Sequence, residues 1–120
     1  MKNSNEQLYP LVFSPIYKEK IWGGSKILNT LRRPAAPENL CGESWEISTV
    51  PDSVSIIKGG HLGGIPLDSA IGSFTHQLVG HKVYEEFGNQ FPLLIKYIDA
   101  HKDLSIQVHP DNELARKRHN

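Results

Sequence analysis

Apolar residues occur in short runs along most of the chain, separated by its ten glycines and eight prolines. This punctuation favours strands and loops over a bundle of long helices. The pattern predicts two strands at residues 45–49 and 53–58, joined by a turn at 51–52. Apolar spacing over residues 67–80 predicts a helix that ends at Gly80. We therefore expect a mainly β fold with a few short helices.

The same reasoning predicts elements at both ends of the chain. Residues 93–99 and 104–110 are two strong strand candidates, which we expect to form a hairpin. Asp111 is placed to cap a helix that follows the second strand. Near the N-terminus, Ser25 is placed to cap a short helix over residues 27–31.

Residues 104–110 carry the first candidate chemistry. Leu104, Ile106 and Val108 share one face of the expected strand, and Ser105, Gln107 and His109 share the other. Because alternate residues of a strand lie roughly 6.5–7 Å apart, Gln107 and His109 can converge on one metal ion. The alternative is a polar face that simply meets solvent, as in many antiparallel sheets.

Lys96 interrupts the first strand of the expected hairpin. A loop of two or four residues places Lys96 opposite Ser105, which would form a polar patch suited to a phosphorylated ligand beside a metal. A loop of three or five residues moves Lys96 to the other face. The alternative for this residue is an edge-strand lysine that discourages aggregation.

A second constellation lies at residues 42–48, Gly-Glu-Ser-Trp-Glu-Ile-Ser. Alternation puts Glu43 and Trp45 on one face, where a carboxylate beside an indole can bind a sugar. The alternatives are a core tryptophan and a solvated glutamate. Trp22, before two glycines, is either an anchor or a lid on a flexible turn.

Composition limits the classes of function. Thirteen basic residues balance thirteen acidic ones, which argues against nucleic-acid binding. Cys41 is the only cysteine, which excludes an intrachain disulfide and a cysteine-based zinc finger. The short apolar run at 11–13 suits neither a signal-peptide core nor a membrane span, so we expect a cytoplasmic protein with no membrane partner.

Four strings together resemble the type I mannose-6-phosphate isomerases in their short bacterial form. They are Lys-Ile-Trp-Gly-Gly at 20–24, Gly-Glu-Ser-Trp-Glu-Ile-Ser at 42–48, Phe-Pro-Leu-Leu-Ile-Lys at 91–96 and Leu-Ser-Ile-Gln-Val-His-Pro-Asp at 104–111. The resemblance covers nearly the whole chain, with the strings in the family's order. It implies a cupin-like β-sandwich, or jelly roll, that holds one zinc ion.

The resemblance also implies roles for individual residues. Gln107 and His109 match two of the family's zinc ligands. Lys96 and Ser105 match its sugar-phosphate site, and Trp22 and Glu43 match an active-site tryptophan and glutamate. The implied activity is the zinc-dependent interconversion of mannose 6-phosphate and fructose 6-phosphate, a step of carbohydrate metabolism with a small sugar phosphate as substrate.

The chain departs from the family pattern in one respect. The family's remaining zinc ligands and its acid/base residues match positions beyond Asn120, so no catalytic residue is assigned. We expect residues 1–120 to be the N-terminal part of the cupin domain, with an incomplete sandwich. The alternatives are a non-catalytic, cupin-like module that binds sugar phosphates and a truncated product with an exposed sheet edge, which predicts aggregation or strand exchange.

Overall fold

The computed structural model describes residues 7–119, which form short strands and short helices. In chain order the elements are β1 (Phe13–Ser14), β2 (Ile16–Gly24), α1 (Lys26–Asn29), β3 (Cys41–Ile47), β4 (Thr49–Val50), β5 (Ser53–Val54), β6 (Ile56–Ile57), α2 (Leu67–Phe74), α3 (His76–Val79), α4 (His81–Phe87), β7 (Ile95–Ile98) and α5 (Asn112–His119). No helix in this described part is long and apolar enough to cross a membrane. The prediction of a strand-rich fold with short helices is confirmed.

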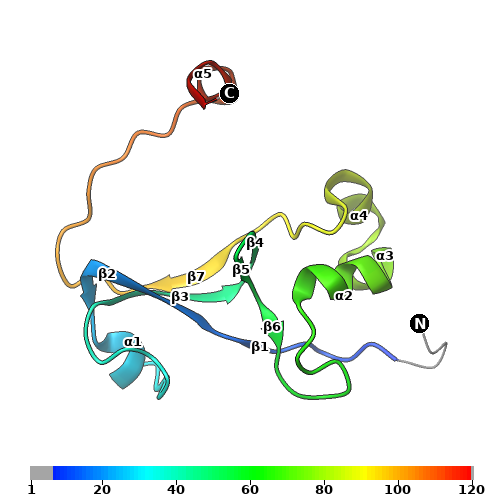
Figure 1. Ribbon diagram of the computed structural model, residues 1–120, viewed down its shortest axis with the longest axis horizontal. Helices are drawn as coiled ribbons and strands as arrows, with labels where there is room; N and C mark the ends of the chain where they lie inside the picture. The colour runs from blue at the N-terminus through cyan, green and yellow to red at the C-terminus, as the bar shows by residue number, and fades with distance from the viewer. Residues whose placement is uncertain (1–6, 120) are drawn as a thin grey trace.

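Three antiparallel strands in the order β2-β3-β7 form the largest sheet (Figure 1). Lys18 of β2 lies opposite Glu43 of β3, and Lys96 of β7 lies opposite Trp45 of β3. Residues that face each other across an antiparallel pair point to the same face of the sheet. These four side chains therefore share one face.

The opposite face of this sheet is covered. Ile27 of α1, Ala36 and Cys41 form a buried cluster with Tyr17 packed against it. Ala36 lies in a loop most of whose residues are exposed. Cys41 is fully buried, as a free cysteine that packs like a small apolar residue commonly is.

A second cluster lies between β6 and α2. Ile57 of β6 packs with Leu62 and with Ala70 and Phe74 of α2, so the helical spacing predicted for this segment is confirmed up to Phe74. The helix does not continue to Gly80, because the backbone of Thr75 has φ 52°. A second short helix, α3, begins directly afterwards, and Gly80 follows its last residue. The predicted turn at 51–52 is also confirmed, since it joins β4 to β5.

The predicted hairpin between residues 93–99 and 104–110 is wrong. After β7 the chain continues along the sheet, because the amide of Asp99 donates to Gly42 O (2.8 Å) and the amide of His101 donates to Trp22 O (2.8 Å). Ala100 also forms a bridge with Gly23. The residues expected to turn are thus bound to β3 and β2, and the chain does not reverse there.

Residues 104–110 form no strand in the described structure and run away from the sheet to α5 (Figure 1). Ile106 is 98% exposed and Val108 is 91% exposed. An extended segment becomes a strand only when a neighbour takes its backbone hydrogen bonds. The described residues offer this segment no such neighbour.

The two predicted helix caps have opposite outcomes. Asp111 caps α5, because its Oδ1 accepts a hydrogen bond from the amide of Leu114 (2.8 Å). Ser25 precedes α1 but makes no capping hydrogen bond with its side chain. Asp99 Oδ2 accepts instead from the amide of Lys26 (2.8 Å), so the carboxylate that caps α1 comes from the end of the sheet.

Candidate functional site

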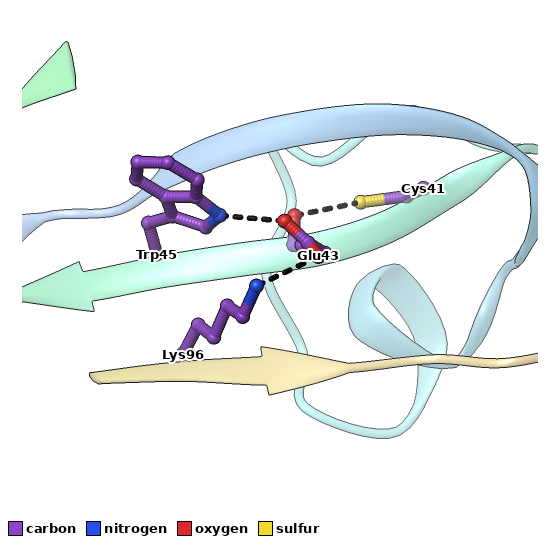
Figure 2. A network of polar contacts seen from close by, with 4 residues as sticks. All are labelled: Cys41, Glu43, Trp45 and Lys96. Carbon is purple, nitrogen blue, oxygen red and sulfur yellow. Dashed lines mark hydrogen bonds and ion pairs between the residues drawn. The ribbon is translucent and has the colours of Figure 1, made fainter. Parts of the chain in front are cut away.

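The candidate site lies on the middle strand of the sheet. Glu43 and Trp45 occupy alternate positions of β3 and point to the same face, as the alternation of the sequence predicts. β2 supplies Lys18 to this face and β7 supplies Lys96. Figure 2 shows Trp45 and Lys96 on two sides of the Glu43 carboxylate.

Each oxygen of the Glu43 carboxylate has a donor. Lys96 Nζ donates to Oε1 (2.9 Å), and Trp45 Nε1 donates to Oε2 (2.7 Å) (Figure 2). Glu43 is only 8% exposed. Its burial raises the pKa, while the hydrogen bonds from Lys96 and Trp45 and the charges of Lys96 and Lys20 lower it. The net pKa lies below the ordinary value of a glutamate, so the carboxylate is charged at neutral pH.

Lysines outnumber carboxylates around Glu43. Lys18 Nζ lies 4.5 Å from the centre of the Trp45 ring, and Lys96 Nζ lies 5.7 Å from it. Lys18 also donates to Ser53 Oγ (2.6 Å), and Lys20 acts on the pKa of Glu43. Lys96 and Lys20 thus act on Glu43, and Lys18 adds a third positive charge near Trp45, which makes the surroundings of this glutamate suited to an anion.

Trp22 packs against Gly42, the residue before Glu43 on β3. A Cβ atom on Gly42 would stand 2.9 Å from Trp22 Cη2, so the indole rests against the backbone of the residue before Glu43. Only glycine leaves room for this approach. Of the residues expected to bind substrate, Glu43 and Lys96 are in contact, whereas Trp22 packs on the side of β3 to which Gly42 points, the opposite side from Glu43.

Ser44 and Glu46 form a separate polar group, as the alternation of β3 predicts. Glu46 accepts hydrogen bonds from Ser44 Oγ (2.8 Å) and from Arg33 Nη2 (3.2 Å). Arg33 belongs to the loop that follows α1, so these contacts hold the loop against the sheet. They stabilise the fold and are not part of the group around Glu43.

The other expected site residues lie elsewhere. Ser105, Gln107 and His109 are exposed on the segment after the sheet. Lys96 does not lie opposite Ser105, where a loop of two or four residues would have placed it, because residues 104–110 pair with no strand in the described structure. His109 supplies an imidazole nitrogen that zinc commonly binds, while the amide oxygen of Gln107 is a less common zinc ligand. Within residues 7–119 there is no group of three or more histidine, cysteine, aspartate or glutamate residues placed to hold a metal ion. The two donors therefore do not form a zinc site by themselves.

Two contacts in this group were not predicted from the sequence. Trp45 was interpreted as a core or sugar-stacking residue, and its N–H donation to Glu43 was missed. The Glu-x-Trp spacing on a strand was the available signal, because it puts a carboxylate and an indole on one face. For Lys18 no signal existed, since its place opposite Glu43 depends on the pairing register of β2.

Comparison with known proteins identifies the class of fold. The chain superposes on the crystal structure of the mannose 6-phosphate isomerase from Bacillus subtilis with a TM-score of 0.72 and 33% sequence identity, over 91% of this chain and 33% of that one. It superposes on a phosphomannose isomerase from Salmonella typhimurium with a TM-score of 0.73 and 27% identity, over 88% of this chain and 27% of that one. The fold is therefore the cupin-like β fold of these isomerases.

The family follows from the sequence match. The family model of the phosphomannose isomerase type I catalytic domain matches residues 11–120, and the chain belongs to this family. A probable mannose-6-phosphate isomerase of Bacillus subtilis (strain 168) is 37% identical over 112 residues, which are 93% of this chain and 34% of that protein. The mannose-6-phosphate isomerase of Streptococcus mutans is 39% identical over 110 residues, 88% of this chain and 32% of that protein. The chain spans about a third of the length of these relatives.

Proposed function

We propose that this chain contributes to an aldose–ketose isomerase that interconverts mannose 6-phosphate and fructose 6-phosphate. Its relatives carry that name, and its membership of the family supports the proposal. The structural observation that carries it is the buried, charged Glu43 held between Lys96 and Trp45. A buried ion pair of this kind is costly unless it is fully hydrogen-bonded, and such groups concentrate at functional sites.

Lys96 is suited to bind the phosphate of the substrate. An ammonium group has three N–H donors, and Glu43 accepts from it in this structure. The remaining donors are available to phosphate oxygens, and the charges of Lys18 and Lys20 favour an anion nearby. Binding the phosphate away from the reacting carbons would orient the sugar for proton transfer between C1 and C2.

We propose zinc as the cofactor, with Gln107 and His109 as two of its ligands. The support is the Gln-x-His spacing, which puts both donors on one face of an extended segment, and the nature of the two donors. Bound zinc would supply Lewis-acid stabilisation of the charge that develops on the sugar oxygens. A catalytic zinc site normally has three protein ligands, so at least one further donor is required.

The second candidate function is a cupin-like module that binds a sugar phosphate without turnover. It is favoured by the lack of a three-residue metal group among residues 7–119. Both functions use Lys96 in the same way, and they differ in the requirement for zinc and in turnover.

The test measures fructose 6-phosphate formation from mannose 6-phosphate, with zinc added and with a chelator, and phosphate binding by NMR. The isomerase proposal predicts turnover that requires zinc and is lost in Lys96→Ala. Binding without turnover supports the module instead.

Lys117→Ala is the matched control, because Lys117 also pairs with a glutamate (Glu113, 2.8 Å) but on an exposed helix. Lys96→Ala should weaken phosphate binding by about tenfold or more, the value of a charge-assisted hydrogen bond. If Lys96→Ala and Lys117→Ala have the same effect, Lys96 is not a phosphate ligand.

A further inference from the structure

Trp45 has a polar contact that packing alone does not require. Its indole N–H donates to Glu43 Oε2 at 2.7 Å, a short distance typical of a bond to a charged acceptor. A carboxylate as buried as Glu43 becomes neutral, or destabilises the fold, when its oxygens lack donors. The two donors of Glu43 come from different residues and approach different oxygens. Trp45 therefore holds Oε2, the carboxylate oxygen to which Lys96 does not donate.

The indole that makes this contact is itself held in place. Lys18 Nζ lies 4.5 Å from the centre of its ring, in the range of a cation–π contact, and is fixed by Ser53 Oγ at 2.6 Å. Lys96 lies directly opposite Trp45 across the β3–β7 pair. Strands β2, β3 and β7 thus each contribute to the position of the ring. A ring held from several strands is a rigid support for a carboxylate.

We propose that Trp45 is a positioning residue. Its indole orients the Glu43 carboxylate so that Oε1 accepts the hydrogen bond from Lys96. The position of the carboxylate in turn sets where Lys96 presents its ammonium group to a phosphate. The part of this proposal that concerns phosphate rests on the proposed function. The part that concerns the orientation of the Glu43 carboxylate by Trp45 is independent of the proposed function. Trp45 touches neither the sugar nor the phosphate in this role, since it acts through Glu43 on Lys96.

The variant Trp45→Phe separates positioning from packing. Phenylalanine keeps an aromatic ring beneath Lys18 but has no N–H donor. If Trp45 positions Glu43, the variant raises the pKa of the Glu43 carboxyl, measured by a carbon-detected NMR titration, and weakens the binding of inorganic phosphate by about three- to tenfold. In a Glu43→Ala background the same substitution has no further effect on phosphate binding, because the residue through which Trp45 acts is absent.

A measurement on the unmodified chain covers the case in which Trp45→Phe does not fold. The indole N–H resonance of Trp45 should move with pH, with the same midpoint as the Glu43 carboxyl. The chain contains a matched control in Trp22, whose indole does not donate to Glu43 in the described structure and should move much less.

The outcomes are distinct. An unchanged pKa of Glu43 in Trp45→Phe, or indole resonances of Trp45 and Trp22 that respond equally to pH, overturns the proposal. If the unmodified chain binds no phosphate, Lys96 is not a phosphate ligand. The proposed function and the effect of Trp45 on phosphate binding are then both wrong. The Glu43 titration still decides whether Trp45 orients the carboxylate.

Discussion

Two consecutive segments of similar character end up in different environments. Residues 93–99 and 104–110 are both rich in apolar residues, and both were predicted to be strands. The first is bound to β3 through β7 and the amide of Asp99, and the chain after it stays bound to β2 through the amide of His101. The second has no strand partner in the described structure and is exposed. A strand-like pattern therefore marks a segment that is able to pair, while the available neighbour decides whether it does.

The difference extends to the candidate chemistry. Lys96 lies on the paired segment and meets Glu43 and Trp45 in a fixed geometry. Gln107 and His109 lie on the unpaired segment and converge on nothing within residues 7–119. The sheet thus positions Lys96 and Glu43 of the expected site, while it does not position the donors of Gln107 and His109.

The largest effect is expected where β2 approaches the paired segment. In Gly23→Ala the new Cβ would lie 2.7 Å from the carbonyl carbon of Cys41, and Gly23 also bridges to Ala100. Because the clash is with backbone, we expect a loss of about 3 kcal/mol or more in the free energy of unfolding, measured in urea. Asp103→Ala, on exposed chain between the two segments, should change the stability by less than about 0.5 kcal/mol. Equal losses would show that the close approach of β2 to β3 is not needed.

A smaller effect is expected at the end of the paired segment. Asp99→Ala removes the acceptor for the amide of Lys26, which should cost about 1–2 kcal/mol, the value of a helix cap. Ser25→Ala is the matched control, because Ser25 holds the usual capping position but makes no capping bond. The urea unfolding midpoints of Asp99→Ala and Ser25→Ala, compared with that of the unmodified chain, measure the two losses of stability. A greater loss in Ser25→Ala than in Asp99→Ala would contradict the assignment of the cap.

Glu43, which pairs with Lys96 of the paired segment, makes the stability of the fold sensitive to acid. Its pKa is lower in the folded chain than in the unfolded chain, so its contribution to stability is complete above the unfolded-state pKa. The contribution is lost as the pH falls through the folded-state pKa, below about pH 5. Urea unfolding at several pH values should therefore show a shallower acid dependence in Glu43→Gln than in the unmodified chain. Identical slopes would mean that Glu43 does not hold a lowered pKa.

Several features of this structure could be predicted from the sequence for local reasons. The turn at 51–52, the apolar face of α2 and the Asp111 cap each depend on residues close together in the chain. The shared face of Glu43 and Trp45 follows in the same way from alternation along one strand. Local periodicity and capping rules are sufficient for such features.

The features that could not be predicted depend on distant pairs. The cap of α1 by Asp99 joins residues 73 positions apart, and the place of Lys18 beside Trp45 depends on the register of β2. The hairpin prediction failed for the same reason, since residues 99–102 bind β2 and β3, which a local pattern does not reveal. The grouping of Ser105, Gln107 and His109 was predicted from a strand, and no strand forms there in the described structure.

The smallest effect is expected on the unpaired segment. Ile106 is 98% exposed, so Ile106→Ala removes no buried surface and should change the free energy of unfolding by less than about 0.5 kcal/mol. Ile27→Ala removes a similar side chain that is 1% exposed and should cost about 2–5 kcal/mol. Amide hydrogen exchange extends the contrast to the backbone: the amides of Asp99 and His101 should exchange slowly, while those of residues 105–108 should exchange at nearly the rate of an unfolded chain. Slow exchange at 105–108, with a large loss in Ile106→Ala, would show that this segment pairs in solution after all. The comparison between the two segments would then fail, because both would be strands.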